Sequence, residues 1–343
     1  MAPPPGPRLR PSILIGSLVL LVGALAAGLL VGPVSVPFGG TLAEIADRLP
    51  LVSIDSGLDD RQAAIVWELR LPRVLLGAMV GAALSVSGAA YQGVFRNPLA
   101  DPYLLGVAAG AGLGATLVIV GGGSIGLIPV AAFGGAVAAV VVAYALGSIG
   151  AGPRSGATLI LAGVAVAAFF TAAQTFVQQQ NADSVREVFT WILGRLSTSG
   201  WGEVAVLAPY AAVGIFVILL HRRLLDVLAV GEEEAGALGA DPRRVRLAVV
   251  VAATLTTAAA VAVSGLIGFV GIIVPHTVRL IVGVSYRAIL PVALVGGAAF
   301  LVLADLAART VLSPAEIPIG VVTAFVGAPF FALVLRTSKR GVS

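Results

Sequence analysis

The chain has 343 residues, of which 58% are hydrophobic and only 11% are charged, and its mean hydropathy is +1.04. Soluble domains average about 45–50% apolar and about 25% charged residues, so this composition excludes a soluble enzyme and a disordered chain and predicts an integral membrane protein. The net charge of +4 comes with few aromatic residues and does not indicate nucleic acid, and the lack of cysteine excludes disulfides and thiolate-bound metals.

Ten stretches are long and apolar enough to cross a bilayer as helices, which takes about 20 residues each. They lie approximately at residues 13–31, 74–94, 102–120, 126–148, 157–178, 204–221, 245–264, 266–284, 288–308 and 317–335. They predict an all-α fold with ten transmembrane helices in one domain, residues 13–335, between tails at 1–12 and 336–343. The 43 glycines predict helices that pack closely through small faces, as in transporters and channels.

The first stretch has a second interpretation, because Arg8 and Arg10 precede an apolar run as they would in a signal peptide. A cleavable signal has an apolar core of about 7–15 residues. The run from Ser12 to Val31 is longer, although residues 24–26 (Ala-Leu-Ala) resemble a cleavage site. A retained helix is therefore favoured over a cleaved signal.

Lysine and arginine are distributed unevenly over the connecting segments. With the N terminus inside, the cytoplasmic segments hold two thirds of the 21 Lys and Arg residues. Because positive residues are enriched on the cytoplasmic side, we expect both termini there. Of the outer segments, residues 36–73 and 178–201 are long enough to carry structure, and the second predicts a surface helix over 184–193. Trp191 and Trp201 in it are typical of an interfacial aromatic belt.

The cytoplasmic segment of residues 222–246 is the most charged part of the chain and has an ordered pattern. An apolar run ends at Gly231, and Glu232–Glu234 then suit the positive end of a helix that Gly239 would end. The arginines at both ends of the segment could serve only to enforce topology. Topology does not require the acidic core, so we expect a docking surface for a cytoplasmic partner.

No phosphate-binding loop supplies energy within this chain. The pattern G-x-x-x-x-G-K-[ST] is absent, and the single lysine, Lys339, lies in the tail. ATP would therefore have to be hydrolysed by a separate subunit. The alternative is ion coupling through Asp305, the one acid well inside a predicted span, whose structural interpretation is an ion pair with Arg309 one helical turn later.

A series of short motifs runs through the chain. The first half contains residues 69–73 (LRLPR), 81–92 (GAALSVSGAAYQ), 96–102 (RNPLADP) and 105–106 (LG). The second half contains residues 161–164 (LAGV), 191–194 (WILG), 263–279 (VSGLIGFVGIIVPHTVR), 304–309 (ADLAAR) and 316–331 (EIPIGVVTAFVGAPFF). Over about residues 60–335 this order resembles the FecCD family, the permease subunits of ABC importers for iron-siderophores, haem and cobalamin.

The resemblance implies a homodimer of ten-helix subunits with the pathway at the dimer axis. Two cytoplasmic ABC ATPases would bind ATP and Mg²⁺, and this chain itself would bind no cofactor or metal and catalyse no reaction. The residues that match the family's ATPase-coupling loop are Leu225, Leu228, Gly231, Glu232, Ala235, Leu238 and Gly239.

An extracytoplasmic substrate-binding protein is the further partner that the resemblance implies. It would dock through its glutamates on Arg70, Arg73 and Arg309, with Asp305 holding Arg309 in place. Arginine suits this role because its planar fork grips carboxylates with two hydrogen bonds. The alternative for Arg70 and Arg73 is interfacial anchoring at the start of a helix.

The family's inner gate matches Asn97, Pro98 and Leu99, where proline prevents the backbone from continuing as a helix. The fifth predicted span is expected to line the pathway. Its small residues would leave room there, and Phe169, Phe170 and Gln174 would face the cargo.

The expected function is therefore the permease of an importer in a bacterial cytoplasmic membrane, multi-pass and surrounded by lipid. A ferric siderophore is the first candidate for the cargo, followed by haem and cobalamin. Two rival classes stay open at this point, a proton-coupled secondary transporter that uses Asp305 and a purely structural or channel-like membrane protein.

Overall fold

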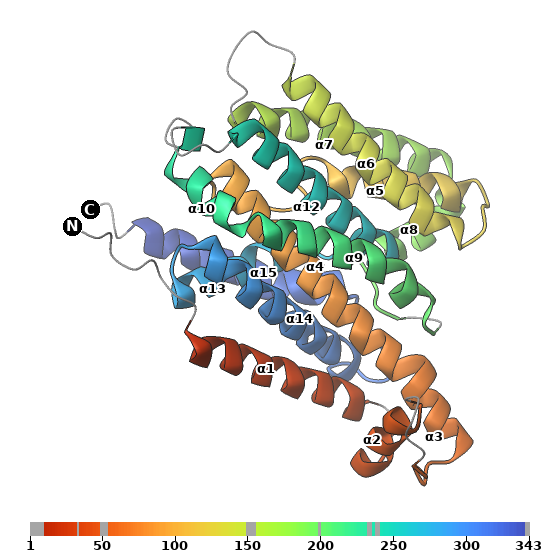
Figure 1. Cartoon of the computed structure of the whole chain (residues 1–343). Coiled ribbons are helices and arrows are strands. Elements are labelled where there is room, and N and C mark those ends of the chain that lie inside the picture. The colour runs from red at the N-terminus through yellow and green to blue at the C-terminus, as the bar shows by residue number, and fades with distance from the viewer. Residues whose placement is uncertain are drawn as a thin grey trace.

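The computed structural model describes residues 10–32, 34–48, 54–148, 156–197, 200–231, 235–236 and 241–339. Over these residues the chain is helical and contains no strand (Figure 1). The elements in chain order are α1 (Pro11–Leu30), α2 (Phe38–Asp47), α3 (Asp60–Ala64), the π-helix η1 (Ile65–Arg70), α4 (Leu71–Phe95), α5 (Val107–Val120), α6 (Leu127–Gly147), α7 (Gly156–Gln180), the 3₁₀ turn η2 (Ala182–Ser184), α8 (Val185–Ile192), α9 (Gly202–Leu220), α10 (Arg222–Val230), α12 (Pro242–Ser264), α13 (Val270–Val282), α14 (Tyr286–Thr310) and α15 (Ile319–Lys339).

Seven of the described helices, counting the continuous stretch Asp60–Phe95 as one, are long and apolar enough to cross a membrane. Three shorter apolar helices accompany them, namely α5, α13 and the Ile319–Val334 part of α15. Each of the ten stretches taken from the sequence coincides with one of these helices. The all-helical fold is confirmed, whereas the number of ten crossings stays a prediction. The first helix begins and the last ends on the same side of the molecule (Figure 1).

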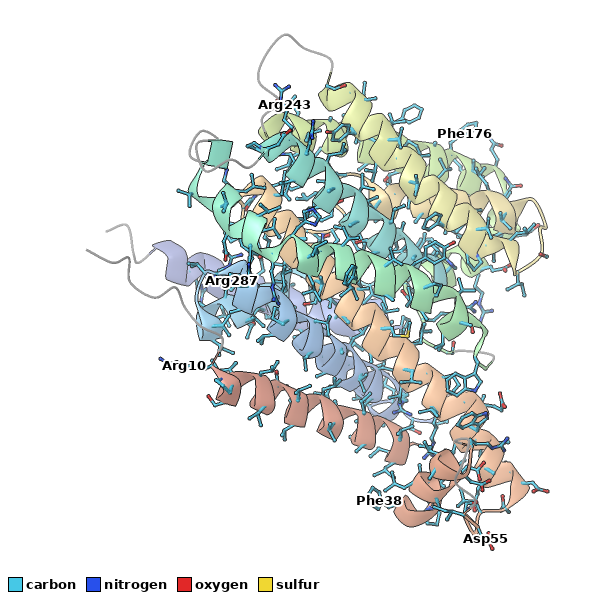
Figure 2. The ribbon with its side chains drawn as sticks, in the orientation of Figure 1. Arg10, Phe38, Asp55, Phe176, Arg243 and Arg287 are labelled. Carbon is cyan, nitrogen blue, oxygen red and sulfur yellow. The ribbon has the colours of Figure 1, made fainter. Side chains whose placement is uncertain are left out.

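The surface of the bundle exposes more large apolar side chains than is typical of a protein surface in contact with water. Phe169 on α7 is 70% exposed and Leu280 on α13 is 74% exposed. Phe176 on α7 also projects away from the bundle (Figure 2). Such faces match the acyl chains of a bilayer, where an exposed apolar side chain carries no penalty.

Helix α4 forms the centre of the molecule, with α14, α12, α13 and α9 packed around it. The backbones come close because glycines face each other. A Cβ atom added to Gly81 would lie 2.2 Å from the carbonyl oxygen of Gly297 on α14. A Cβ atom at Gly88 would lie 2.0 Å from the oxygen of Gly271 on α13. Close packing through small faces is confirmed at these contacts.

A second group, α5, α6 and α7, lies beside this core (Figure 1). Glycines again permit the contact, since a Cβ atom at Gly110 of α5 would lie 2.1 Å from the oxygen of Gly135 on α6. Gly163 on α7 meets the oxygen of Leu104 in the same way, at 2.2 Å. Gly163 is therefore a close packing contact between α7 and the loop before α5. Helix α12 joins the two groups by contacting both α4 and α6.

The first long segment between predicted spans is folded at the end of the bundle opposite α10 (Figure 1). On α2, the buried carboxylate of Glu44 accepts hydrogen bonds from Ser56 Oγ at 3.0 Å and from Arg48 Nε at 3.1 Å. Asp59 and Gln62 form a capping box at the start of α3. These contacts organise the segment far more than a plain connector requires.

The second of these segments contains the predicted surface helix as α8, preceded by the turn η2. Trp191 on α8 is only 7% exposed, so it packs into the protein and does not form part of a lipid-facing belt. Trp201 instead packs against Trp67, with ring centroids 5.0 Å apart. Both tryptophans therefore hold protein elements together.

Candidate functional site

The segment predicted to couple to an ATPase begins as helix α10, which folds back against the bundle. Its Leu225 and Leu228 side chains are 0% and 3% exposed. Leu225 packs beside α4, because a Cβ atom at Gly93 would lie 3.1 Å from Leu225 Cδ2. Both leucines therefore point into the permease, and the exposed side of α10 carries Arg222 and Arg223.

Asp226 ties α10 to the start of α14. Its carboxylate accepts a hydrogen bond from Ser285 Oγ at 2.7 Å and another from the backbone N–H of Tyr286 at 2.5 Å. The first N–H groups of a helix lack partners within it, and a carboxylate there also interacts favourably with the helix dipole. Asp226 thus caps α14 from a different element. This role could not be predicted from the sequence, because the partners are about sixty positions apart in the chain.

Gly231 ends α10 with a backbone φ of 155°, a region that residues with a side chain rarely adopt. Its carbonyl oxygen accepts a hydrogen bond from the Ala235 N–H at 3.0 Å, and Ala235 is fully buried. The apolar run thus forms α10 and ends before Gly231, as the sequence pattern indicated. Glu232, Leu238 and Gly239 lie outside the described residues.

The predicted gate residues Asn97, Pro98 and Leu99 form the turn that follows α4. Arg96 ends the helix in the left-handed conformation, with a φ of 50°. The Asn97 side-chain oxygen then accepts a hydrogen bond from the Leu99 N–H at 3.0 Å. Pro98 is exposed and lines a cavity of about 820 Å³ next to α10. The structure places the three residues in a folded turn at the α10 end, and gating stays a prediction.

Directly after this turn, Asp101 and Tyr103 fix the loop that leads into α5. The Asp101 carboxylate accepts a hydrogen bond from the Tyr103 N–H at 2.7 Å, and the Tyr103 hydroxyl donates to the Ile267 carbonyl at 3.0 Å. Burial raises the pKa of the Asp101 carboxyl to about 6. This loop is therefore held by partners in its own backbone and in the segment before α13.

The three predicted pathway residues on α7 point in different directions. Phe169 is 70% exposed. Phe170 packs against the small residues of α6. Gln174 is only 8% exposed and lies against α5, because a Cβ atom added to Gly112 would be 2.7 Å from Gln174 Oε1. Only Phe169 is thus on an open face in the single chain.

At the opposite end, Arg73 on α4 holds two carboxylates. Its Nη2 donates to Asp305 Oδ1 at 2.8 Å and its Nε lies 3.1 Å from both Asp305 oxygens. Its Nη1 and Nη2 donate to Glu316 at 2.8 and 2.9 Å. The Arg73 guanidinium holds the pKa of Glu316 below its usual range. The expected partner of Asp305 was Arg309, but Arg309 Nε is 3.6 Å away, so Arg73 is the principal partner.

The other two predicted docking arginines are buried, at 5% exposure for Arg70 and 6% for Arg309. Arg70 donates to the carbonyl oxygens of Leu29 at 2.8 Å and Leu30 at 3.3 Å, and also to that of Val34. Arg309 donates to the carbonyl oxygen of Gly28. Both side chains therefore satisfy carbonyl groups at the C-terminal end of α1.

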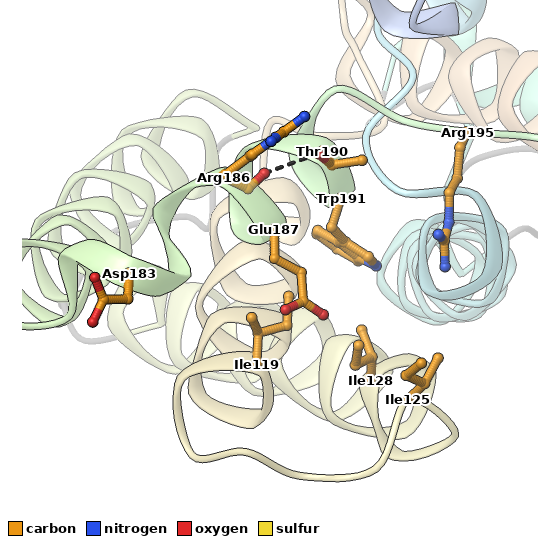
Figure 3. A pocket seen from close by; sticks show the side chains of 9 residues that line it. All are labelled: Ile119, Ile125, Ile128, Asp183, Arg186, Glu187, Thr190, Trp191 and Arg195. Carbon is orange, nitrogen blue, oxygen red and sulfur yellow. Dashed lines mark hydrogen bonds between the residues drawn. The ribbon is translucent and has the colours of Figure 1, made fainter.

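Two of the hollows beside α8 at this end are both lined by Arg195. The larger, of about 410 Å³, lies between the isoleucines around the α5–α6 turn and the polar side of α8, where Glu187 and Trp191 extend toward them (Figure 3). The smaller, of about 270 Å³, contains Arg73. Arg195 is exposed, as is Arg186, and neither has an ion-pair partner among the described residues. Neither arginine was among the predicted docking residues.

Nothing in the described part of the chain resembles a metal centre, because no three His, Asp or Glu side chains lie close enough to hold an ion. The charged groups form ion pairs and helix caps. This arrangement can therefore bind a partner, fix the positions of helices and transmit movement between them.

Comparison with known proteins gives consistent matches along the chain. The sequence model of the FecCD transport family matches residues 18–337. The chain is 39% identical over 355 residues to the cobalamin import system permease protein BtuC of Halobacterium salinarum, covering 93% of this chain and 94% of that protein. It is 38% identical over 342 residues to the hemin transport system permease protein HmuU of Yersinia pestis, covering 97% and 98%. A solved structure of a metal-chelate type ABC transporter in an inward-facing conformation matches with a TM-score of 0.83 at 30% identity, covering 96% of this chain and 100% of the other.

Proposed function

Because the chain belongs to the FecCD transport family, we propose that it is the permease of an ATP-driven importer for a ferric siderophore, or else for haem or cobalamin. The family consists of ABC transporter permeases, which are transport subunits that work with an ATPase and a substrate-binding protein. Relatives named for cobalamin and hemin support a bulky metal chelate as the cargo. In this proposal the chain catalyses no reaction. It converts ATP-driven movement of the ATPases into alternating access of the pathway to the two sides of the membrane.

The observation that carries this proposal is the attachment of α10 to two long helices. Leu225 packs against α4, and Asp226 holds the first residues of α14. A displacement of α10 is therefore transmitted to both helices. We propose that each ATPase binds the exposed face of α10 together with the residues that follow as far as Gly239, and that its closure on ATP and Mg²⁺ moves α4 and α14.

A second copy of the chain is proposed to cover the exposed faces of α7 and α15. Phe169 on α7 is 70% exposed and Phe325 on α15 is 77% exposed. An apolar passage between two such faces would bind the cargo weakly and release it. Phe170 and Gln174 pack within the subunit, so they would act on this passage through the position of α7.

The end that carries α2, α3 and α8 is proposed to receive the substrate-binding protein. Arg73 is the reachable member of the predicted docking set, with 14% of its side chain exposed. Arg70 and Arg309 would support docking by fixing the end of α1. The exposed Arg186 and Arg195 add cations for acidic groups of the partner.

This arrangement implies a defined orientation in a bacterial cytoplasmic membrane. The α10 end and both termini would face the cytoplasm, in agreement with the excess of arginine on that side. The turn of Asn97, Pro98 and Leu99 would then lie at the inner mouth of the pathway, where the family gate was expected.

The alternative of a proton-coupled transporter rests on Asp305. A proton carrier must exchange with water from both sides in turn. Asp305 is 3% exposed and is fixed by three contacts to Arg73. This environment favours a structural role for Asp305. Because the proton-coupled alternative depends on this residue, the ATP-driven importer is preferred.

Assembly with the ATPase tests the proposal. The double substitution Arg222→Glu and Arg223→Glu changes only the exposed face of α10, so the permease should fold and purify while copurification of the ATPase encoded beside it falls at least tenfold. The matched control is Arg186→Glu with Arg195→Glu at the opposite end, which should leave ATPase binding unchanged. Normal ATPase recovery with the α10 variant would contradict the assigned docking face.

A further inference from the structure

A cavity of about 820 Å³ opens at the α10 end of the bundle. Its walls come from the end of α4, from α10, from α13 and from the turn between α13 and α14. It is lined by Gln92, Gly93, Arg96, Pro98, Asp226, Ala229, Val230, His276, Arg279, Val284, Ser285, Tyr286 and Arg287. In this set, Pro98 is a predicted gate residue and Asp226 caps α14. The set also contains several cationic side chains that take part in neither the gate nor the cap.

The charge of the cavity is strongly positive. Arg96, Arg279 and Arg287 line it, and Asp226 is the one acid among the lining residues. Both oxygens of Asp226 already accept hydrogen bonds from the start of α14. The cavity therefore offers several donors for an anion and no comparable acceptor for a cation.

Arg279 is held in place for such a role. Its Nη2 donates to Gln92 Oε1 at 3.2 Å and to the Tyr286 hydroxyl at 3.1 Å, and its guanidinium carbon lies 5.5 Å from the centre of the Tyr286 ring. Its buried Nε has no hydrogen-bond partner in the described structure, and neither has the buried Nδ1 of His276. The Arg279 guanidinium and the His276 ring thus keep hydrogen-bonding capacity that protein atoms do not use.

The rim of the cavity is apolar and open. Val230 at the end of α10 is 68% exposed and Val284 before α14 is 72% exposed. The cations lie at helix ends, where a membrane helix meets the headgroup layer. Arg287, the second residue of α14, is exposed (Figure 2). A ligand with an anionic head and an apolar body would fit both parts of the site.

We propose that this cavity binds the phosphate headgroup of an anionic phospholipid from the leaflet on the α10 side. The phosphate accepts hydrogen bonds from Arg96, Arg279 and Arg287, and the acyl chains lie along Val284. Basic pockets between membrane helices commonly hold such headgroups. Because its walls include both α10 and the start of α14, a bound lipid reinforces the contact made by Asp226 and so strengthens the connection between the ATPase side and the membrane helices.

Lipid retention by the purified full-length chain tests this site. The chain is incubated in detergent micelles with dioleoylphosphatidylglycerol or dioleoylphosphatidylcholine, and bound lipid is counted by native mass spectrometry. The double substitution Arg96→Gln and Arg287→Gln changes two exposed side chains and should preserve the fold. It is expected to lower the affinity for phosphatidylglycerol about tenfold, or about 1.4 kcal/mol, with little change for phosphatidylcholine.

The matched control is Arg222→Gln with Arg223→Gln, which removes the same charge from the same end but outside the cavity. Equal losses of phosphatidylglycerol in the two double variants would overturn the site. A second arm adds inorganic phosphate at millimolar concentration. Phosphate that binds in the cavity while phosphatidylglycerol does not would show a site for a free anion and would overturn the assignment to lipid. Neither arm requires the ATPase, so the outcome is independent of the proposed transport function.

Discussion

Arg73 and Asp305 are joined by a two-pronged ion pair across 232 positions of sequence, with Arg73 Nη2 2.8 Å from Asp305 Oδ1 and Nε 3.1 Å from the same oxygen. The pair connects α4 with α14, the two helices that also receive α10 at the other end of the bundle. The same two helices therefore carry a fixed contact at each end. This arrangement allows them to move as one body, as the proposed transmission of movement requires.

Substitution of Arg73 by alanine should destabilise the protein. It leaves the buried carboxylate of Asp305 with only the more distant Arg309, and breaking one side of a buried ion pair costs about 3–5 kcal/mol. Thermal unfolding in detergent, followed by circular dichroism, measures the loss.

Glu316→Gln serves as the control for this variant, because Glu316 is half-exposed and an exposed pair contributes about 1 kcal/mol or less. If both variants unfold at the same temperature, the Arg73–Asp305 pair does not have the stabilising role assigned to it.

A methyl group at Gly88 should disrupt the contact between α4 and α13. Its Cβ atom would lie 2.0 Å from the Gly271 carbonyl oxygen, so Gly88→Ala forces the two helices apart. We expect a loss of several kcal/mol or failure to accumulate in the membrane. Gly134→Ala is the matched control, since apart from its own helix backbone no described atom lies within 4 Å of its Cβ position, and alanine there should raise helix stability by up to about 1 kcal/mol. Indistinguishable yields and unfolding temperatures would refute the close packing.

Removal of the Asp226 carboxylate should weaken coupling more than folding. Asp226→Ala leaves Ser285 and the first N–H of α14 without their acceptor, which costs about 1–2 kcal/mol as for other helix caps. ATPase binding should persist while transport per ATP hydrolysed falls severalfold, because α14 no longer follows α10. Reconstituted complexes in which both rates are measured provide the readout, and an unchanged ratio would argue against the link through Asp226.

Asp101 should make stability depend on pH. Because its folded-state pKa is raised to about 6, the folded state favours the protonated carboxyl. Its favourable contribution is complete below about pH 4 and is lost as the pH rises to about 6. Asp101→Asn keeps an acceptor for the Tyr103 N–H and should therefore be more stable than the parent at pH 8, by up to about 3 kcal/mol. Unfolding curves at pH 4 and pH 8 test this, and a variant that is equally affected at both values would contradict it.

The helices could be predicted well because hydropathy is a local property that each stretch carries by itself. The end of α10 was also readable, since a glycine after an apolar run is a common helix stop. The packing of glycine against glycine followed from composition, although the paired positions, such as Gly81 with Gly297, did not.

The partners of charged and amphipathic residues could not be predicted in this way. Asp305 has Arg309 as its neighbour in sequence, but Arg73 reaches it with better geometry from another helix. Leu225 and Leu228 match the family's coupling loop, and the structure buries both within the permease; the part that each takes in coupling stays a prediction. An amphipathic pattern fixes which face of a helix is buried and leaves open what buries it.

The central claim, transport driven by ATP, is tested most directly by uptake into proteoliposomes that contain the permease with its ATPase. With the binding protein and a ferric siderophore, haem or cobalamin outside, uptake should require ATP and Mg²⁺ inside and should persist when a protonophore removes the proton gradient. Asp305→Asn protein that still folds should retain this dependence on ATP. Uptake by the chain alone, driven by a proton gradient and abolished by Asp305→Asn, would contradict the account.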